Sequence, residues 1–304
     1  MLNQDYSNYS VVYIDDCSPD STGKRVARWC KAHHCGKRWT VIRNTERRGS
    51  LANIVWAVHN SAAQHEIIIV LDGDDYFSHS QVLSKINKLY QQNVWVLYGQ
   101  FQNIPSGKRG FSKIYPPEVI TTNTFRKFGF FAGAPRTFYA WIMHKIAHKD
   151  MQEQNDSGLF FQCAGDVAFM FPLLEMAGSH HAFYDDDILY LRTTNTGIND
   201  FLIHKSEQER ITRYIRSQDP YQPLEIWQYG AHTLCTPTTL RKVFIRSPQT
   251  LDTPWCDRFY FQNNSLNNLF YENIQEAPPN TQNQKSNRPT NDTALKTPTY
   301  NNFK

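Results

Sequence analysis

The sequence predicts an α/β fold with an open, mostly parallel β-sheet and helices on both faces. Short apolar runs rich in β-branched residues alternate with segments whose apolar residues recur at helical spacing, an order typical of parallel sheets. The third run, Ile67–Leu71, is apolar without interruption, as expected for a strand buried on both faces. Polar residues directly after these runs place the candidate chemistry at one edge of the sheet.

Four strands and three helices account for the first hundred residues. We expect strands over residues 9–14, 39–42, 67–71 and 94–98, and helices over 21–34, 49–64 and around 82–89. Asp20 precedes the first helix and is placed to cap it. Because a helix separates each strand from the next, the strands are expected to run parallel.

The remainder of the chain gives a less regular pattern. Prolines interrupt residues 101–151, where we expect loops and short helices. Further expected elements are a helix through Tyr139–Ile142, a helix over 166–176 with Pro172 near its start or at a kink, a strand over 187–192, and a helix behind a capping box of Ser206 and Glu209. We expect Phe138, Tyr139 and Trp141 in the core rather than against a sugar, and His180-His181 with Asp185–Asp187 in a solvated turn.

Composition excludes several classes of protein. The net charge of +4 is small and the basic residues form no long block, so nucleic acid is not an expected partner. No apolar run reaches the length of a membrane helix and the start resembles no secretory signal. We therefore expect a cytoplasmic protein, with peripheral membrane association left open. The cluster Cys30–Cys35 lacks a second ligand pair for zinc, and the six cysteines indicate reduced thiols.

Polar tips follow three neighbouring strands of the predicted sheet. The first strand ends in Asp15-Asp16, the second in Arg43-Asn44 and the third in Asp72–Asp75. In an open parallel sheet, ligands bind beyond the carboxyl ends of the strands. Clustered carboxylates repel one another unless a cation or a hydrogen-bonding ligand is present. Because Asp20 suffices to cap the first helix, Asp15 and Asp16 are expected to be available to a ligand.

The triplet Asp72-Gly73-Asp74 is the most specific chemical feature. Two carboxylates after a buried strand suit a hard divalent ion such as Mg²⁺ or Mn²⁺, which binds one or two carboxylates together with substrate phosphates. Gly73 lets the backbone turn and approach a diphosphate closely. The alternative for this triplet is a solvated loop between strand and helix.

Three segments together resemble family 2 glycosyltransferases, the nucleotide-sugar enzymes of the GT-A fold. Val12–Thr22 resembles that family's "VDDxSxDxT" segment, and Ile69–Asp75 resembles its "LDxDD" metal motif. Between them, Arg43-Asn44 with Gly49, Ala52 and Asn53 is similar to the family's next stretch. The resemblance covers about residues 3–100 well and weakens afterwards.

The resemblance implies a role for each matching residue. Asp16, with Asp15, would contact the base, and Arg43, Asn44 and Arg48 would line the nucleotide pocket. Asp72 and Gly73 would lie at the ribose and diphosphate, and Asp72 and Asp74 would hold the metal.

A later segment, Cys163–Phe169, resembles the family's "ED" segment, which carries the catalytic base. Gly165 replaces the usual Glu, and Asp166 keeps the position of the base. Asp166 is therefore the expected catalytic residue, with a simple acid at a helix N-terminus as the alternative. Asn195 stands where some relatives have a metal-binding His, which leaves a third protein ligand in doubt.

The start of the chain departs from the family pattern. Members begin with a strand, a nucleotide-contacting loop and a helix, whereas Leu2–Asn8 looks like the end of that helix. The first strand, which is normally central, is expected to be missing, and its loss would expose backbone groups and an apolar groove. Three explanations for the missing strand are open: the true start lies upstream, the gene is degraded, or a partner strand fills the gap.

The resemblance implies a glycosyltransferase that moves a sugar from a nucleoside-diphosphate sugar to a hydroxyl acceptor, inverting and dependent on Mn²⁺ or Mg²⁺. Residues 1–100 would form the nucleotide-sugar-binding half and 101–220 the acceptor-binding half. Residues 221–275 would be a C-terminal extension and 276–304 a disordered tail, since they are rich in Asn, Gln, Pro and Thr. The alternatives are a truncated, inactive binding module and, ranked lower, a nucleotidyltransferase.

Overall fold

The structure is a computed structural model that describes residues 4–155, 157–194, 205–224 and 242–246, the last of these as backbone only. All described residues belong to one compact unit, Met1–Asn267. The predicted tail over 276–304 and the candidate residue Asn195 lie outside the described residues.

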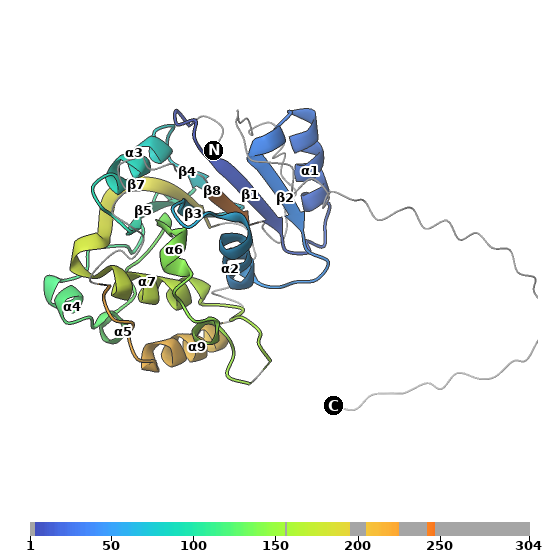
Figure 1. Cartoon of the computed structure of the whole chain (residues 1–304). Coiled ribbons are helices and arrows are strands. Elements are labelled where there is room, and N and C mark those ends of the chain that lie inside the picture. Colours follow the sequence, from blue (N-terminus) through green and yellow to red (C-terminus); the bar gives the residue numbers. More distant parts are fainter. Residues whose placement is uncertain (1–3, 156, 195–204, 225–241, 247–304) are drawn as a thin grey trace, which may run out of the picture. The chain divides into compact units, whose positions relative to one another are not determined.

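The fold is built on an eight-stranded sheet in the order β2-β1-β8-β3-β6-β5-β7-β4 (Figure 1). The strands are β1 (Ser10–Asp15), β2 (Trp39–Arg43), β3 (Ile67–Asp72), β4 (Tyr76–Phe77), β5 (Val96–Ile104), β6 (Arg136–Tyr139), β7 (Ala182–Thr193) and β8 (Lys242–Arg246). The four strands predicted for the first hundred residues are confirmed as β1, β2, β3 and β5. They share one direction, because β6 is antiparallel to both β3 and β5 while β8 is parallel to both β1 and β3.

Helices pack around this sheet. They are α1 (Thr22–Ala32), α2 (Ser50–Ser61), α3 (Val82–Tyr90), α4 (Pro117–Thr121), α5 (Phe125–Phe128), α6 (Ala140–Met143), α7 (Gly165–His181) and α9 (Lys205–Ser217), with 3₁₀ turns at Gly36–Arg38 and His148–Met151. The first three are the helices predicted from apolar spacing. The helices α4, α5, α7 and α9 contact one another and gather in one part of the molecule (Figure 1). No helix in the described part of the chain has the length and apolar character needed to cross a membrane.

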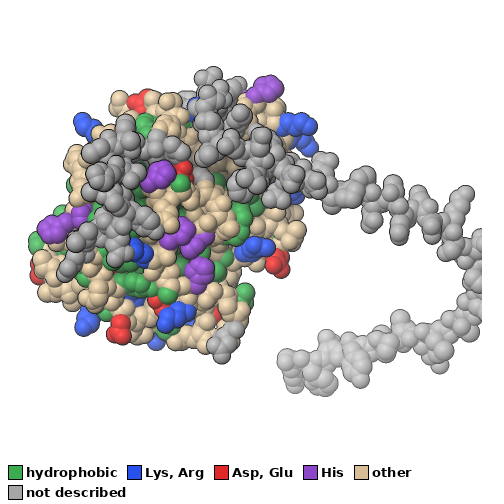
Figure 2. Space-filling view, in the orientation of Figure 1, with side chains coloured by type: hydrophobic (Ala, Val, Ile, Leu, Met, Phe, Trp, Pro, Cys, Tyr) green, Lys and Arg blue, Asp and Glu red, His purple; other side chains and the backbone are tan. Residues whose placement is uncertain are grey.

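The core forms where the apolar runs meet. Ile67, Ile68 and Ile69 of β3 are fully buried, as their uninterrupted apolar run predicts. Phe138 and Trp141 are also buried, which confirms that they belong to the core rather than to a sugar-stacking surface. On the face seen in Figure 2, basic and acidic side chains are scattered singly, with no continuous basic surface among the described residues.

Several helix predictions need correction. Tyr139 ends β6 and the short helix α6 begins only at Ala140. Pro172 lies inside α7, and the residue with non-helical backbone angles is Gly178, six positions later (φ 60°, ψ −157°). Asp20 accepts a hydrogen bond from the backbone N–H of Thr22 at 2.9 Å, while Ser21 occupies the cap position. Ser206 lies within α9 instead of before it, because the first turn of a helix accepts Ser and Glu readily.

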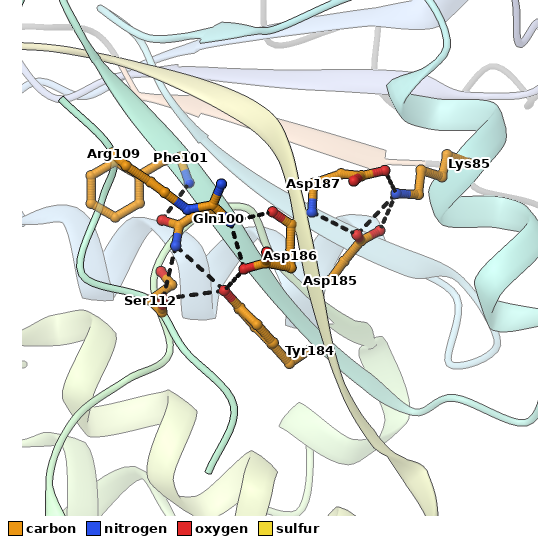
Figure 3. Close-up of polar contacts among 9 residues, drawn as sticks. All are labelled: Lys85, Gln100, Phe101, Arg109, Ser112, Tyr184, Asp185, Asp186 and Asp187. Atoms are coloured by element: carbon orange, nitrogen blue, oxygen red, sulfur yellow. Dashed lines mark hydrogen bonds and ion pairs between the residues drawn. The ribbon is translucent and has the colours of Figure 1, made fainter. Parts of the chain in front are cut away.

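The acidic run Asp185–Asp187 is not a solvated turn, because it lies inside β7. The register jumps there from Gly99 paired with Asp185 to Gln100 paired with Ile188, so two residues of β7 bulge out of the ladder. Lys85 forms ion pairs with Asp185 and Asp187, and Arg109 pairs with Asp186 (Figure 3). The acids are thus compensated by basic residues that lie far away in the sequence.

Candidate active site

The ends of β1 and β3 lie at the same edge of the sheet. Ile14 of β1 and Asp72 of β3 both pair with Arg246 of β8, so they stand at one level, about 10 Å apart across two strand spacings. β2 ends beside them, since Asp15 pairs with Arg43. The polar tips predicted to meet therefore do meet at one edge, which we call the acidic rim: the residues that end or follow β1, β2 and β3.

Asp16 organises the loop that follows β2. Its Oδ1 accepts hydrogen bonds from Asn44 Nδ2 at 2.8 Å and from the N–H of Arg48 at 2.9 Å, and its Oδ2 accepts one from the N–H of Gly49 at 2.9 Å. Burial alone would raise the pKa of Asp16, but these three hydrogen bonds and the nearby Asn53 amide outweigh it and lower the pKa below its ordinary value. Asp16 is therefore a carboxylate that fixes the loop over 44–49.

Asp15 is more enclosed than Asp16. It is 4% exposed, its Oδ1 accepts a hydrogen bond from the N–H of Ser18 at 3.2 Å, and its Oδ2 lies 3.9 Å from Arg43 Nε. A Cβ at Gly23, in the first turn of α1, would lie only 1.9 Å from Asp15 Oδ2. Both acids thus accept hydrogen bonds within the protein, and a carboxylate has about four acceptor sites in all, so their availability to a ligand stays a prediction.

The loop over 44–49 also reaches the segment that carries Asp166. Gly49 has a φ of 89°, and a Cβ there would lie 2.8 Å from the side chain of Gln162. Gln162 Nε2 donates to the carbonyl of Arg48 at 3.2 Å. The side chains of Arg43 and Arg48 are exposed. No pattern in the sequence indicated Gln162.

Asp75 ties the turn after β3 to the end of β7. It is buried, and it accepts hydrogen bonds from Tyr190 Oη at 2.8 Å and from the N–H of Thr193 at 2.7 Å. Burial, and after it the negative charges of Asp72 and Asp74, raise the pKa of Asp75 to about 8, although the hydrogen bonds from Thr193 and Tyr190 oppose this shift. Asp75 is thus a structural acid that holds the triplet Asp72-Gly73-Asp74 in place, a role that the sequence did not reveal.

The donor set after β3 fits a divalent cation. The negative charges of Asp72 and Asp74 act together on Asp75, and a bound cation relieves such repulsion. No group of three or more His, Cys, Asp or Glu residues is arranged around a metal position in the part of the chain that the structure describes. An ion on Asp72 and Asp74 would therefore take its other oxygen ligands from phosphates and water, as Mg²⁺ commonly does.

Asp166 lies in the first turn of α7 and is held by Arg136. Arg136 Nη2 donates to Asp166 Oδ2 at 2.7 Å. Arg136 begins β6 and pairs with Val70, two residues before Asp72, so the ion pair places Asp166 beside the acidic rim. A Cβ at Gly165, where the family pattern has Glu, would lie 3.1 Å from the Leu51 side chain on α2. The sequence did not indicate Arg136.

A mostly parallel sheet with helices around it, and with acids where β1 and β3 end, is the arrangement expected of a GT-A glycosyltransferase. The profile of glycosyl transferase family 2 matches residues 1–165, more than half of the chain. The chain therefore belongs to glycosyl transferase family 2, as its three segments predicted. No curated protein sequence matches this chain closely enough to count as a relative.

Two solved structures resemble this fold at low identity. A crystal structure of residues 1–349 of S. aureus TarS is 15% identical with a TM-score of 0.47, and the match covers 70% of this chain and 57% of that one. A crystal structure of S. aureus TarS is also 15% identical, with a TM-score of 0.46, and the match covers 70% of this chain and 35% of that one. The chain thus spans less than two thirds of the length of either structure.

Proposed function

We propose that this chain transfers a glycosyl group from a nucleoside-diphosphate sugar to the hydroxyl of an acceptor. The observation that carries the proposal is the shared level of Ile14 and Asp72 across β8. It brings the loop organised by Asp16 and the triplet Asp72-Gly73-Asp74 to one edge of the sheet, where a ligand binds in such folds. Family membership supplies the class of donor.

Each residue of the site has a distinct task in this proposal. The loop with Asp15, Asp16, Arg43, Asn44 and Arg48 binds the nucleoside end of the donor. Asp72 and Gly73 lie at the ribose and diphosphate. Mn²⁺ or Mg²⁺ held by Asp72 and Asp74 would supply neutralisation of the charge on the departing diphosphate.

Asp166 acts as the general base. It removes the proton of the acceptor hydroxyl as the acceptor oxygen attacks the anomeric carbon and the bond to the diphosphate breaks. Arg136 holds the carboxylate by the hydrogen bond to Oδ2, so the base is oriented before the acceptor arrives. One displacement inverts the anomeric configuration. Residues 101–220, which carry both Arg136 and Asp166, form the acceptor half in this proposal.

Two other functions make different predictions. An inactive binding module would hold a nucleoside diphosphate but transfer nothing. A nucleotidyltransferase would need a glycine-rich, basic phosphate loop after its first strand, whereas β1 leads into Asp15-Asp16-Cys17. The acids of the rim therefore favour use of a sugar nucleotide over its synthesis.

The test is hydrolysis and transfer with a panel of nucleotide sugars in Mn²⁺. Wild type is compared with Asp74→Ala, Asp166→Asn and the matched control Asp187→Ala, whose carboxylate is 74% exposed in the β7 bulge. We expect activity in wild type and the control, and its loss in the two site variants. Equal rates of hydrolysis and transfer in wild type and Asp74→Ala would overturn the proposal that the chain is an enzyme. Binding of a nucleoside diphosphate without any turnover would show that the chain is an inactive binding module.

A further inference from the structure

The strand β8 occupies the centre of the sheet although it comes from far along the chain. β1 and β3 do not pair with each other, because each pairs with β8 over five residues. Figure 1 shows β8 lying between them. Residues 242–246 thus supply a central strand of the described sheet.

The two edges that flank β8 form a slot suited to a parallel strand. Val11–Ile14 are at most 5% exposed and Ile68–Leu71 at most 9% exposed. An empty slot would leave the facing N–H and C=O groups of β1 and β3 without partners in an apolar setting, which is unfavourable on both sides. Both edges run in the same direction and at one level, so one short parallel strand satisfies both.

The slot separates the two halves of the acidic rim. β1 and β2 carry the residues proposed for the nucleoside, and β3 carries the triplet proposed for the diphosphate. Among the described strands, they are connected through the sheet only by β8. The helix α2 contacts β1, β8, α6 and α7, but a helix contact does not set strand spacing as a hydrogen-bonded ladder does.

We propose that the slot between β1 and β3 is a docking site for a parallel strand, that residues 242–246 of the same chain fill it, and that their seating sets the spacing of the two halves of the rim. Leu224, the last described residue before β8, is hydrogen-bonded to Met176 of α7 at 2.9 Å. The 17 residues of 225–241 can span up to about 60 Å when extended, which is enough to reach the slot within one unit.

A cross-linking experiment on the full chain tests the seating. Ser10 and Lys242 are paired across β1 and β8, and neighbouring strands lie within the Cα separation that a disulfide allows. The variant Ser10→Cys/Lys242→Cys is oxidised and its linked peptides are identified by mass spectrometry. The control Ser10→Cys/Arg246→Cys places the second thiol four residues along β8, about 13 Å away, which is too far to bridge.

We expect a link within single chains for the first pair and at least tenfold less for the control. A covalent dimer would overturn docking within the same chain and show that a second copy supplies the strand. Absence of a disulfide in both variants, or equal amounts in both, would contradict the seating of β8 between β1 and β3 in the register described.

Hydrogen exchange provides the second readout. Phe244→Pro removes a ladder donor from β8, while the matched variant Phe244→Val keeps it. We expect amides of β1 and β3 to exchange at least about tenfold faster in the Pro variant than in the Val variant, with those of β5 unchanged. Equal protection of β1 and β3 would contradict the proposal. Both readouts concern the backbone, so they stand or fall independently of the transfer activity.

Discussion

The carboxylate of Asp16 offers the sharpest test of how the site is built. Asp16→Ala removes the acceptor of three hydrogen bonds. A hydrogen bond to a charged group contributes about 1.5–3 kcal/mol, and a buried donor left without a partner costs about as much. The bond from Gly49 is buried, whereas those from Asn44 and Arg48 are partly exposed, so water can replace part of the latter two.

We therefore expect Asp16→Ala to lower the free energy of unfolding by about 4 kcal/mol, and Asp16→Asn by about half as much because it keeps one acceptor oxygen. The assay is urea denaturation at neutral pH. The control Glu46→Ala changes an exposed carboxylate in the same loop and should stay within about 0.5 kcal/mol of wild type. A cost below about 1 kcal/mol for Asp16→Ala would refute the view that this acid organises the loop.

Three further outcomes follow from buried groups. Glu175→Ala should lower the free energy of unfolding by about 3–5 kcal/mol, because Glu175 and Arg126 form a buried two-bond ion pair at 2.6 and 2.9 Å. Urea denaturation of Glu175→Ala, Arg126→Ala and the double variant measures this loss. Losses that simply add in the double variant would contradict a coupled pair. Gly23→Ala should destabilise the fold by at least about 1 kcal/mol, since its Cβ would meet a buried carboxylate at 1.9 Å; an unchanged melting temperature would contradict it. Burial, then the charges of neighbouring histidines such as His144, lower the pKa of His59 to about 4. The unfolded chain therefore binds more protons than the folded chain between about pH 6.5 and pH 4, so the melting temperature should fall as pH falls through this window. The fall should be shallower in His59→Gln, and an equal fall in wild type and variant would contradict the prediction.

Local sequence patterns were sufficient for most of the first hundred residues, although they missed the two-residue strand β4. Apolar runs such as Ile67–Leu71 and the helical spacing after them depend on neighbours in the chain, so β1, β2, β3 and β5 were predictable with their shared direction. The acids after β1 and β3 were predictable as a shared rim for the same reason, because parallel strands bring their carboxyl ends to one edge.

The parts that the sequence did not reveal depend on partners far apart in the chain. Arg136 meets Asp166 30 positions away, and Asp75 meets Tyr190 115 positions away; neither pair leaves a periodic signal. β6 lies in a stretch interrupted by prolines and was expected to be irregular. β8 is a short apolar run whose partners, β1 and β3, lie some 170 or more residues upstream, so only tertiary pairing identifies it as a central strand.

The central claim is that the acids after β1 and β3, the strands on either side of β8, form one site for a cation and a nucleoside diphosphate. Its most direct test is calorimetry of a panel of nucleoside diphosphates, with and without Mn²⁺, on wild type and Asp74→Ala. We predict that Mn²⁺ tightens binding of at least one nucleotide to wild type by about tenfold or more, which corresponds to about 1.4 kcal/mol, and that Asp74→Ala abolishes this gain. Binding that is indifferent to Mn²⁺, or a gain that persists in Asp74→Ala, would contradict it.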